Sequence, residues 1–106
     1  MFGTIMRARL KPGRRDEFEK YFREVSDEYE DAGRGLISSE IAFEDKDPDR
    51  VVVIVHFRDR DSYFRNADDP QTNADYQKMV EYFDGPPEWI DLNYAGRFAT
   101  EGATAS

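Results

Sequence analysis

The sequence contains no cysteine, which excludes disulfides, thiolate nucleophiles, zinc–thiolate sites and iron–sulfur clusters. It has a single histidine, His56, so a histidine-based metal site is excluded as well. No apolar run approaches the ~20 residues that cross a bilayer as a helix. The N-terminal MFGTIMRARL has no basic segment ahead of an apolar core, as a signal peptide would. We therefore expect a soluble, cytoplasmic protein without a metal ion.

Positive charge is also scarce. Lys and Arg number 15 against 23 Asp and Glu, which gives a net charge of −8 at pH 7. Binding to nucleic acid or to an anionic membrane needs clustered Lys and Arg, so we expect neither as a partner. The acidic runs Asp45–Asp49 and Asp59–Asp61 lack the glycine placement and terminal Glu of a calcium loop, which indicates solvated turns. The sequence also lacks a glycine-rich phosphate loop ahead of a helix, so a nucleotide site is not expected.

The apolar residues that are present suffice for one folded domain. A chain of this size buries roughly two-thirds of the surface that it exposes when unfolded, and 39% of the 106 residues are hydrophobic. The strongest pattern is Val51–Phe57, VVVIVHF, an apolar run broken only by His56. Such a run is typical of a central strand that is covered on both faces.

Alternating apolar and polar residues predict three more strands, at 2–10, 36–44 and 88–98. In the second of these, the alternation places Ile37, Ser39, Ile41 and Phe43 on one face. The residues 45–50, which include Asp47-Pro48-Asp49, are expected to form the loop of a hairpin that joins the strands 36–44 and 51–57.

Helical periodicity predicts the segments between the strands. Apolar residues at i, i+3, i+4 and i+7 indicate a helix from residue 14 to about residue 32. After the central strand, Asp59 or Asp61 can cap a short helix that runs to about residue 67. A further helix begins either at Asp69-Pro70 or at a capping box made by Thr72 and Asp75.

The resulting order, β-α-β-β-α-β with the second helix in two pieces, predicts an α+β, ferredoxin-like fold with a four-stranded antiparallel sheet. Right-handed crossovers place the strands 2–10 and 51–57 in the centre and the helices on one face. We expect this domain to span residues 1–98. The small, polar residues 99–106 are expected to be a disordered tail.

The chain has no element left to cover the other face of this sheet, although the central strand is apolar on both sides. A second copy of the chain is the simplest cover, so we predict a homodimer that packs sheet to sheet. Arg7 and Arg9 would then lie near Glu40, Glu44 or Asp91. The residues expected in this interface are Ile5, Arg7, Arg9, Glu40, Ile54 and His56.

Two segments resemble a known family. The strand 2–10 followed by KPGRRDEF (residues 11–18), and the central strand followed by FRDRDSY (residues 57–63), are similar to the antibiotic biosynthesis monooxygenase-type domain of the dimeric α+β barrel superfamily. The resemblance covers about residues 1–96. It implies a homodimer and a cofactor-independent oxygenase. The substrate would be an electron-rich aromatic or quinol-type molecule held between the sheet and the helices.

Members of this superfamily often carry an aromatic residue, commonly Trp, at the end of the third strand and a His about nine residues later. Here these positions are Phe57 and Asn66. An amide is a poor ligand for iron, so the haem binding found in one branch of the superfamily is not expected. Asn66 can donate and accept hydrogen bonds to a phenolate or a peroxide, but it cannot act as a general base.

The candidate site follows from this resemblance and from the helical spacing. The catalytic candidates are Asn66, Tyr63 and Tyr76, which would position an ionisable hydroxyl of the substrate. The residues expected to line the pocket are Phe57, Met79, Phe83 and Trp89. Two interpretations stay open. These aromatic residues form a substrate pocket, or they fill the core of a non-catalytic, ligand-binding or stress-related barrel. By alternation, His56 points away from this site, toward the predicted interface.

Overall fold

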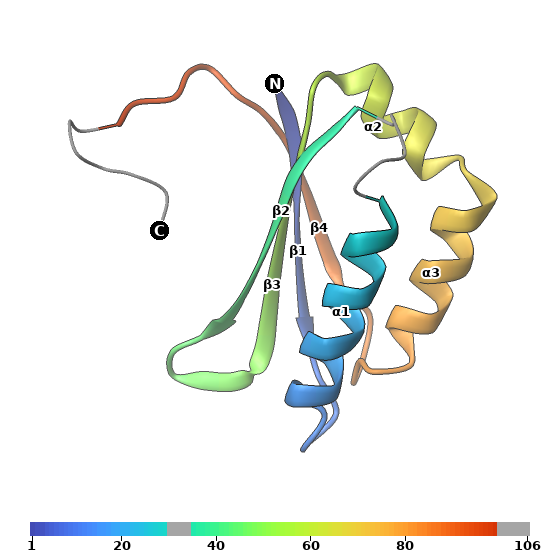
Figure 1. Cartoon of the computed structure of the whole chain (residues 1–106). Helices are drawn as coiled ribbons and strands as arrows, with labels where there is room; N and C mark the ends of the chain where they lie inside the picture. The colour runs from blue at the N-terminus through green and yellow to red at the C-terminus, as the bar shows by residue number, and fades with distance from the viewer. Residues whose placement is uncertain (30–34, 100–106) are drawn as a thin grey trace.

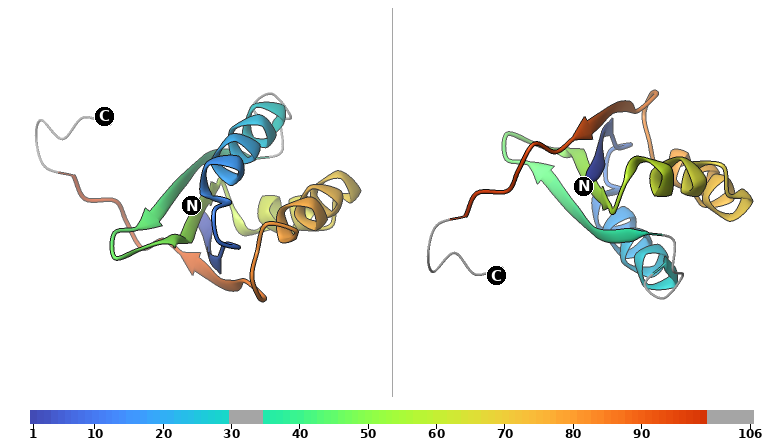
Figure 2. Two further views of the ribbon diagram at one scale, coloured as in Figure 1. Left: turned by 90° about the horizontal axis from the view of Figure 1, so that it is seen from below. Right: turned by 90° about the horizontal axis from the view of Figure 1, so that it is seen from above.

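The computed structural model describes residues 1–29 and 35–99. Within these ranges the chain forms one antiparallel sheet with strand order β2-β3-β1-β4 and three helices. Figure 1 shows the three helices on one side of the sheet, and both views in Figure 2 agree. The elements are β1 (Phe2–Arg9), α1 (Arg15–Tyr29), β2 (Leu36–Glu44), β3 (Asp47–Phe57), α2 (Arg60–Ala67), α3 (Pro70–Val80) and β4 (Glu88–Asn93).

The predicted α+β, ferredoxin-like fold is confirmed, with β1 and β3 in the centre of the sheet. In the register between these strands, Thr4 pairs with Val55 and Ile5 pairs with Ile54. Because successive side chains alternate between faces, Thr4 and Val55 lie on the side of the helices, which we call the helix face. Ile5 and Ile54 lie on the opposite side, which we call the open face.

The helix α1 docks on the helix face through its apolar stripe. Phe18 is fully buried and Phe22 nearly so. The Phe18 ring lies 5.7 Å from the rings of Tyr82 and Phe83, between centroids. Truncating a buried phenylalanine of this kind costs about 3–5 kcal/mol, so this cluster is a main source of stability. The helix was expected to end near residue 32, which lies outside the described residues.

The hairpin between β2 and β3 is tighter than expected. We predicted a loop at residues 45–50, but β3 begins at Asp47 and the turn is made by Asp45 and Lys46. Two contacts hold the start of β3 against the rest of the sheet. Arg9 pairs with the Asp47 carboxylate at 2.8 Å, and the Leu10 N–H donates to the Asp49 carbonyl at 2.7 Å. Pro48 is tolerated because it lies near the beginning of its strand.

The prediction that the Ile37 side chain shares a face with Ser39 is wrong. The register slips between Leu36 and Ser38, which pair with Phe57 and His56, so Ile37 is the extra residue of a bulge. Its side chain is 58% exposed instead of packing beside Ser39.

The last strand is shorter than expected, because β4 ends at Asn93 where residues 88–98 were predicted to be extended in the sheet. After it, the chain leaves the sheet on the side away from the helices (Figure 1), and Phe98 is 96% exposed. Of the predicted disordered tail, residues 100–106 lie outside the described residues. No helix in the described ranges is long and apolar enough to cross a membrane.

Candidate active site

The two short helices after β3 are positioned by aspartate caps. Asp59 accepts a hydrogen bond from the Ser62 N–H at 2.7 Å and begins α2. Asp69 accepts from the Gln71 N–H at 2.8 Å and begins α3. Of the two predicted starts for α3, the one at Asp69-Pro70 is therefore right. Asp68 and Asp69 alone separate the two helices, so the end of α2 lies against the first turn of α3.

Two adjoining hollows lie between the helices and the helix face of the sheet. The inner hollow has a volume of about 160 Å³ and is bounded mainly by α1, α3 and the central strands. The outer hollow, of about 400 Å³, extends toward α2 and β4. The residues that line both hollows are Val55, Phe57, Asn66, Thr72, Tyr76 and Trp89.

Most of the predicted site residues meet at these hollows. Asn66, Tyr76, Phe57 and Trp89 line both of them, while Met79 lines the inner hollow and Tyr63 the outer one. The Tyr76 and Trp89 rings are 5.9 Å apart between centroids and close the site between α3 and β4.

Phe83 is not in either lining. It is packed against Phe18 in the core, next to its bridge with Leu10.

Asn66 is held by a residue of the neighbouring helix. The Thr72 hydroxyl donates a hydrogen bond to Asn66 Oδ1 at 3.2 Å. This bond fixes the orientation of the amide, whose Nδ2 carries the N–H groups that can donate to a bound ligand. The site can therefore offer a hydrogen bond to a phenolate, a carbonyl or a reduced oxygen species.

Tyr63 is part of a second polar group, at the edge of the outer hollow. Asp91 Oδ1 accepts hydrogen bonds from the Tyr63 hydroxyl at 3.0 Å and from the Thr4 hydroxyl at 2.8 Å. Burial raises the pKa of Tyr63 above its ordinary 10.0, and Asp91 raises the pKa further, while a hydrogen bond with Thr4 opposes the shift. The Tyr63 hydroxyl is thus neutral, and its hydrogen bond is already donated to Asp91.

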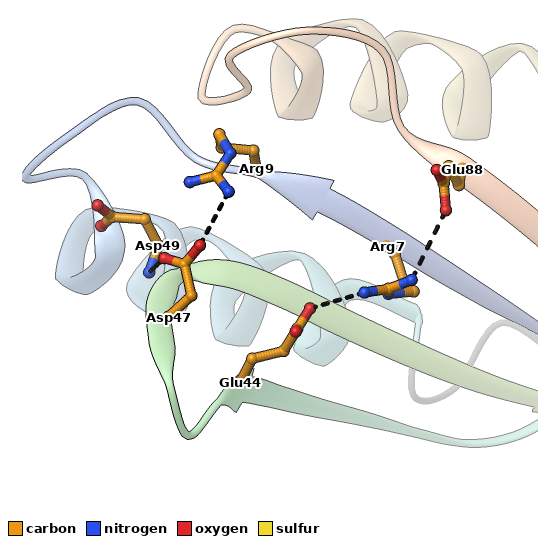
Figure 3. Close-up of polar contacts among 6 residues, drawn as sticks. All are labelled: Arg7, Arg9, Glu44, Asp47, Asp49 and Glu88. Atoms are coloured by element: carbon orange, nitrogen blue, oxygen red, sulfur yellow. Dashed lines mark hydrogen bonds and ion pairs between the residues drawn. The ribbon is translucent and has the colours of Figure 1, made fainter.

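Of the carboxylates expected near Arg7 and Arg9 (Glu40, Glu44 or Asp91), Glu44 does pair with Arg7, whereas Asp91 lies on the other face of the sheet. β4 pairs with β1 so that Asp91 is opposite Thr4, which puts its carboxylate on the helix face. The arginines find other partners on the open face, as Figure 3 shows. Arg7 lies between Glu44, at 3.2 Å, and Glu88, at 3.8 Å, and Arg9 contacts Asp47.

The sequence interpretation missed one buried carboxylate. Asp75 is 6% exposed and lines the inner hollow. Its Oδ1 accepts from Gln71 Nε2 at 3.1 Å, and its backbone carbonyl accepts from the Tyr21 hydroxyl at 2.8 Å. The signal was its place four residues before Met79, on the stripe that faces inward, but Asp75 was interpreted only as part of a cap.

His56 lies on the open face, as alternation predicted, opposite Gly3 and Ser38. Its Nε2 is 2.9 Å from Glu40, and its ring centroid lies 5.4 Å from that of Tyr94. No histidine therefore lines either hollow among the described residues, so haem iron would find no imidazole there. Across residues 1–29 and 35–99, no cluster of three or more His, Asp or Glu is arranged to hold a metal ion.

Comparisons with known proteins agree with this architecture. No curated protein sequence matches the chain. SnoaB from Streptomyces nogalater, described as a cofactor-independent oxygenase and solved as an asparagine-to-alanine mutant, superposes with a TM-score of 0.80 at 15% identity, over 93% of this chain and 97% of that one. A structure of an antibiotic biosynthesis monooxygenase superposes with a TM-score of 0.75 at 14% identity, over 91% and 100%. A conserved protein from Methanosarcina mazei Go1 gives 0.76 at 15% identity, over 86% and 89%.

At these identities the structural matches show the fold alone. The family model of antibiotic biosynthesis monooxygenases, however, matches residues 1–80, which is most of the chain. The chain therefore belongs to the antibiotic biosynthesis monooxygenase family.

Proposed function

We propose that this protein is a cofactor-independent monooxygenase that oxidises a small, quinol-like aromatic substrate in the two hollows. The observation that carries the proposal is the Asn66 amide, held by Thr72 at the junction of two hollows whose lining is mostly apolar and aromatic. Small-molecule sites are commonly built in this way, from apolar walls with a few placed polar groups. The family membership supports the same class of reaction, as does the likeness to SnoaB, a cofactor-independent oxygenase.

The substrate itself supplies the electrons in the proposed reaction. A hydroquinone that reacts with O₂ gains one oxygen atom and becomes a hydroxyquinone, and the second oxygen atom leaves as water. The substrate loses four electrons and O₂ gains four, so neither a flavin nor a metal is needed. Asn66 Nδ2 would donate to the negative oxygen that forms on the substrate or on the reduced O₂, which is the role of an oxyanion donor.

Oxygen uptake by the purified protein tests the proposal. We expect uptake with at least one member of a panel of hydroquinones and polyphenols, in the presence of EDTA, and a loss of roughly 100-fold in Asn66→Ala. Gln77→Ala, on the exposed side of α3, is the matched control. Saturable binding without uptake would favour the non-catalytic, ligand-binding alternative, and uptake that is equal in Asn66→Ala would contradict the site.

We also infer that the protein is a homodimer joined through the open face. Ile5 and Ile54 are only partly buried there, and Ile90 on the neighbouring strand is 49% exposed. The arginines of this face already contact carboxylates of their own chain, so covering it leaves few charges unpaired. The cytoplasmic location expected from the cysteine-free sequence stays a prediction, which cell fractionation would check.

A further inference from the structure

The proposed reaction needs a proton acceptor that the predicted catalytic residues do not provide. A phenol gives up an electron to oxygen far more readily once its hydroxyl is ionised. Asn66 cannot take that proton, because an amide is not a base at neutral pH. Tyr63 and Tyr76 are phenols themselves, and the pKa of Tyr63 is raised above 10.0 by burial. A further group must therefore accept the proton.

Asp75 is placed to be that group. It is the one carboxylate among the described residues that line the two hollows, and those linings contain no Lys, Arg or His. The other residues that line the inner hollow include Phe22, Val25 and Met79, so Asp75 borders a largely apolar space. General bases in enzymes are typically carboxylates or imidazoles that lie within reach of the substrate hydroxyl.

The surroundings of Asp75 hold the carboxylate in position. Gln71 Nε2 donates to Oδ1 at 3.1 Å from the preceding turn of α3. The Tyr21 hydroxyl, from α1, donates to the Asp75 backbone carbonyl and so fixes this turn of α3 against α1. The other ionisable groups that line the hollows are Tyr76, next to Asp75 on α3, and Tyr63 on α2.

We propose that Asp75 is the general base that ionises the substrate hydroxyl, an inference that rests on the proposed monooxygenase function. The substrate O–H bond breaks, the proton moves to the Asp75 carboxylate, and the electron pair stays on the substrate oxygen. Asn66 Nδ2 donates to the resulting phenolate, which then reacts with O₂. The acceptor and the donor line the same inner hollow, one from α3 and one from α2.

The test uses Asp75→Asn, which keeps the shape of the side chain and an acceptor for Gln71 but cannot take up a proton. The probes are 1,4-dihydroxynaphthalene and a chlorinated analogue whose phenol is more acidic. Below the pKa of each probe we expect oxygen uptake to fall about 100-fold in Asp75→Asn. As the pH rises through the pKa of the probe, solvent supplies the phenolate and the deficit should disappear. The more acidic probe should recover at lower pH.

Binding is measured separately, by anaerobic titration of Trp89 fluorescence, since Trp89 is the single tryptophan and lines both hollows. We expect Asp75→Asn to bind the probes as tightly as the wild type does. Asp27→Asn, an exposed carboxylate on α1, is the control and should change neither quantity. If Asp75→Asn does not fold, Asp75→Glu, which keeps a carboxylate, replaces it and should retain uptake, and a complete loss of uptake in a folded Asp75→Glu would overturn the inference.

The outcomes separate the two proposals. A deficit that is the same at every pH would show that Asp75 is structural and would overturn the inference, as would an unchanged rate in Asp75→Asn. With either of these two results the wild type still takes up oxygen, so the proposed monooxygenase function would stand. A wild type that takes up no oxygen with any probe overturns the proposed function and the role of Asp75 with it.

Discussion

The Thr72 hydroxyl donates a hydrogen bond to Asn66 Oδ1 at 3.2 Å and so joins the first turn of α3 to the last turn of α2. Both residues line both hollows. The candidate catalytic amide is thus oriented by a residue from the adjacent helix.

This contact predicts that Thr72 acts through Asn66. Thr72→Val removes the hydroxyl at nearly constant volume and should lower kcat/KM by roughly 5- to 10-fold, the worth of one hydrogen bond of about 1 kcal/mol. Thr72→Ser keeps the hydroxyl and should retain most of the activity. Oxygen uptake measures both, and a thermal melt checks that the fold is kept.

A double-mutant cycle separates this role from a general structural one. In an Asn66→Ala background, Thr72→Val should have no further effect, because the group that it orients is absent. Effects that multiply fully in the double mutant would contradict the positioning role of Thr72.

The Tyr63–Asp91 pair predicts the behaviour of the protein in alkali. Since burial raises the pKa of Tyr63 in the folded state, folding disfavours its ionised form. Below pH 10 this tyrosine is neutral in both the folded and the unfolded chain, so its ionisation has no effect on stability there. As the pH rises above 10 the unfolded chain loses the proton first, and stability falls.

Ultraviolet titration of phenolate absorbance measures this shift as the difference between the wild type and Tyr63→Phe. The ionisation that is present in the wild type and absent from Tyr63→Phe belongs to Tyr63, and its midpoint should lie above pH 10. In Asp91→Asn this midpoint should move down toward 10, since Asp91 contributes to the raised pKa of Tyr63. A Tyr63 that titrates below 10 would contradict the geometry of this pair.

The interface proposed on the open face predicts how the inferred homodimer can be broken. Ile54→Glu places a charge in the centre of this face, opposite Ile5, and burying an unpaired charge is costly. Light scattering should give twice the mass of one chain for the wild type and the mass of one chain for Ile54→Glu at micromolar concentration. Ala74→Glu, on the exposed side of α3, should stay dimeric. A wild type that is monomeric at this concentration would rule out the interface.

Gly35 and Gly13 form a matched pair for a test of the packing beneath α2. Both have φ of +78°, a conformation that costs most other residues about 1 kcal/mol or more. A Cβ on Gly13 would meet open space, whereas a Cβ on Gly35 would collide with the side chain of the fully buried Ser62.

Gly13→Ala should therefore lower the free energy of unfolding by about 1 kcal/mol, and Gly35→Ala by roughly 2–4 kcal/mol, because overpacking adds to the backbone strain. Urea denaturation measures both values. Equal losses in the two variants would show that Ser62 is not packed against Gly35.

The fold could be predicted because its main signals are local. The two-sided apolar run at Val51–Phe57 indicates a central strand whatever its neighbours are, and the stripe that contains Phe18 and Phe22 indicates a helix docked by one face. The bulge at Ile37 could not be predicted, since a bulge depends on which residues of β3 are paired with β2.

The candidate site was predicted in part for the same reason. Asn66 and Tyr63 follow from their position after the central strand. The face of Asp91 depends on the register between β4 and β1, and the burial of Asp75 depends on how α3 rolls against α1. The register is not encoded in the spacing of residues along one strand, so the face of Asp91 emerges only from the folded chain. The place of Asp75 four residues before Met79 does indicate an inward face, but the depth of its burial emerges only when α3 is packed against α1.

The most direct test of the monooxygenase function is the fate of isotopically heavy oxygen. The wild type is incubated with ¹⁸O₂ and the hydroquinone that gives the highest uptake, in EDTA and without flavin, and the mass of the product is measured by mass spectrometry. We predict one heavy oxygen atom in each product molecule, one O₂ consumed per product, and loss of the labelled product in Asn66→Ala. An unlabelled quinone formed together with an equal amount of hydrogen peroxide would contradict the proposed reaction.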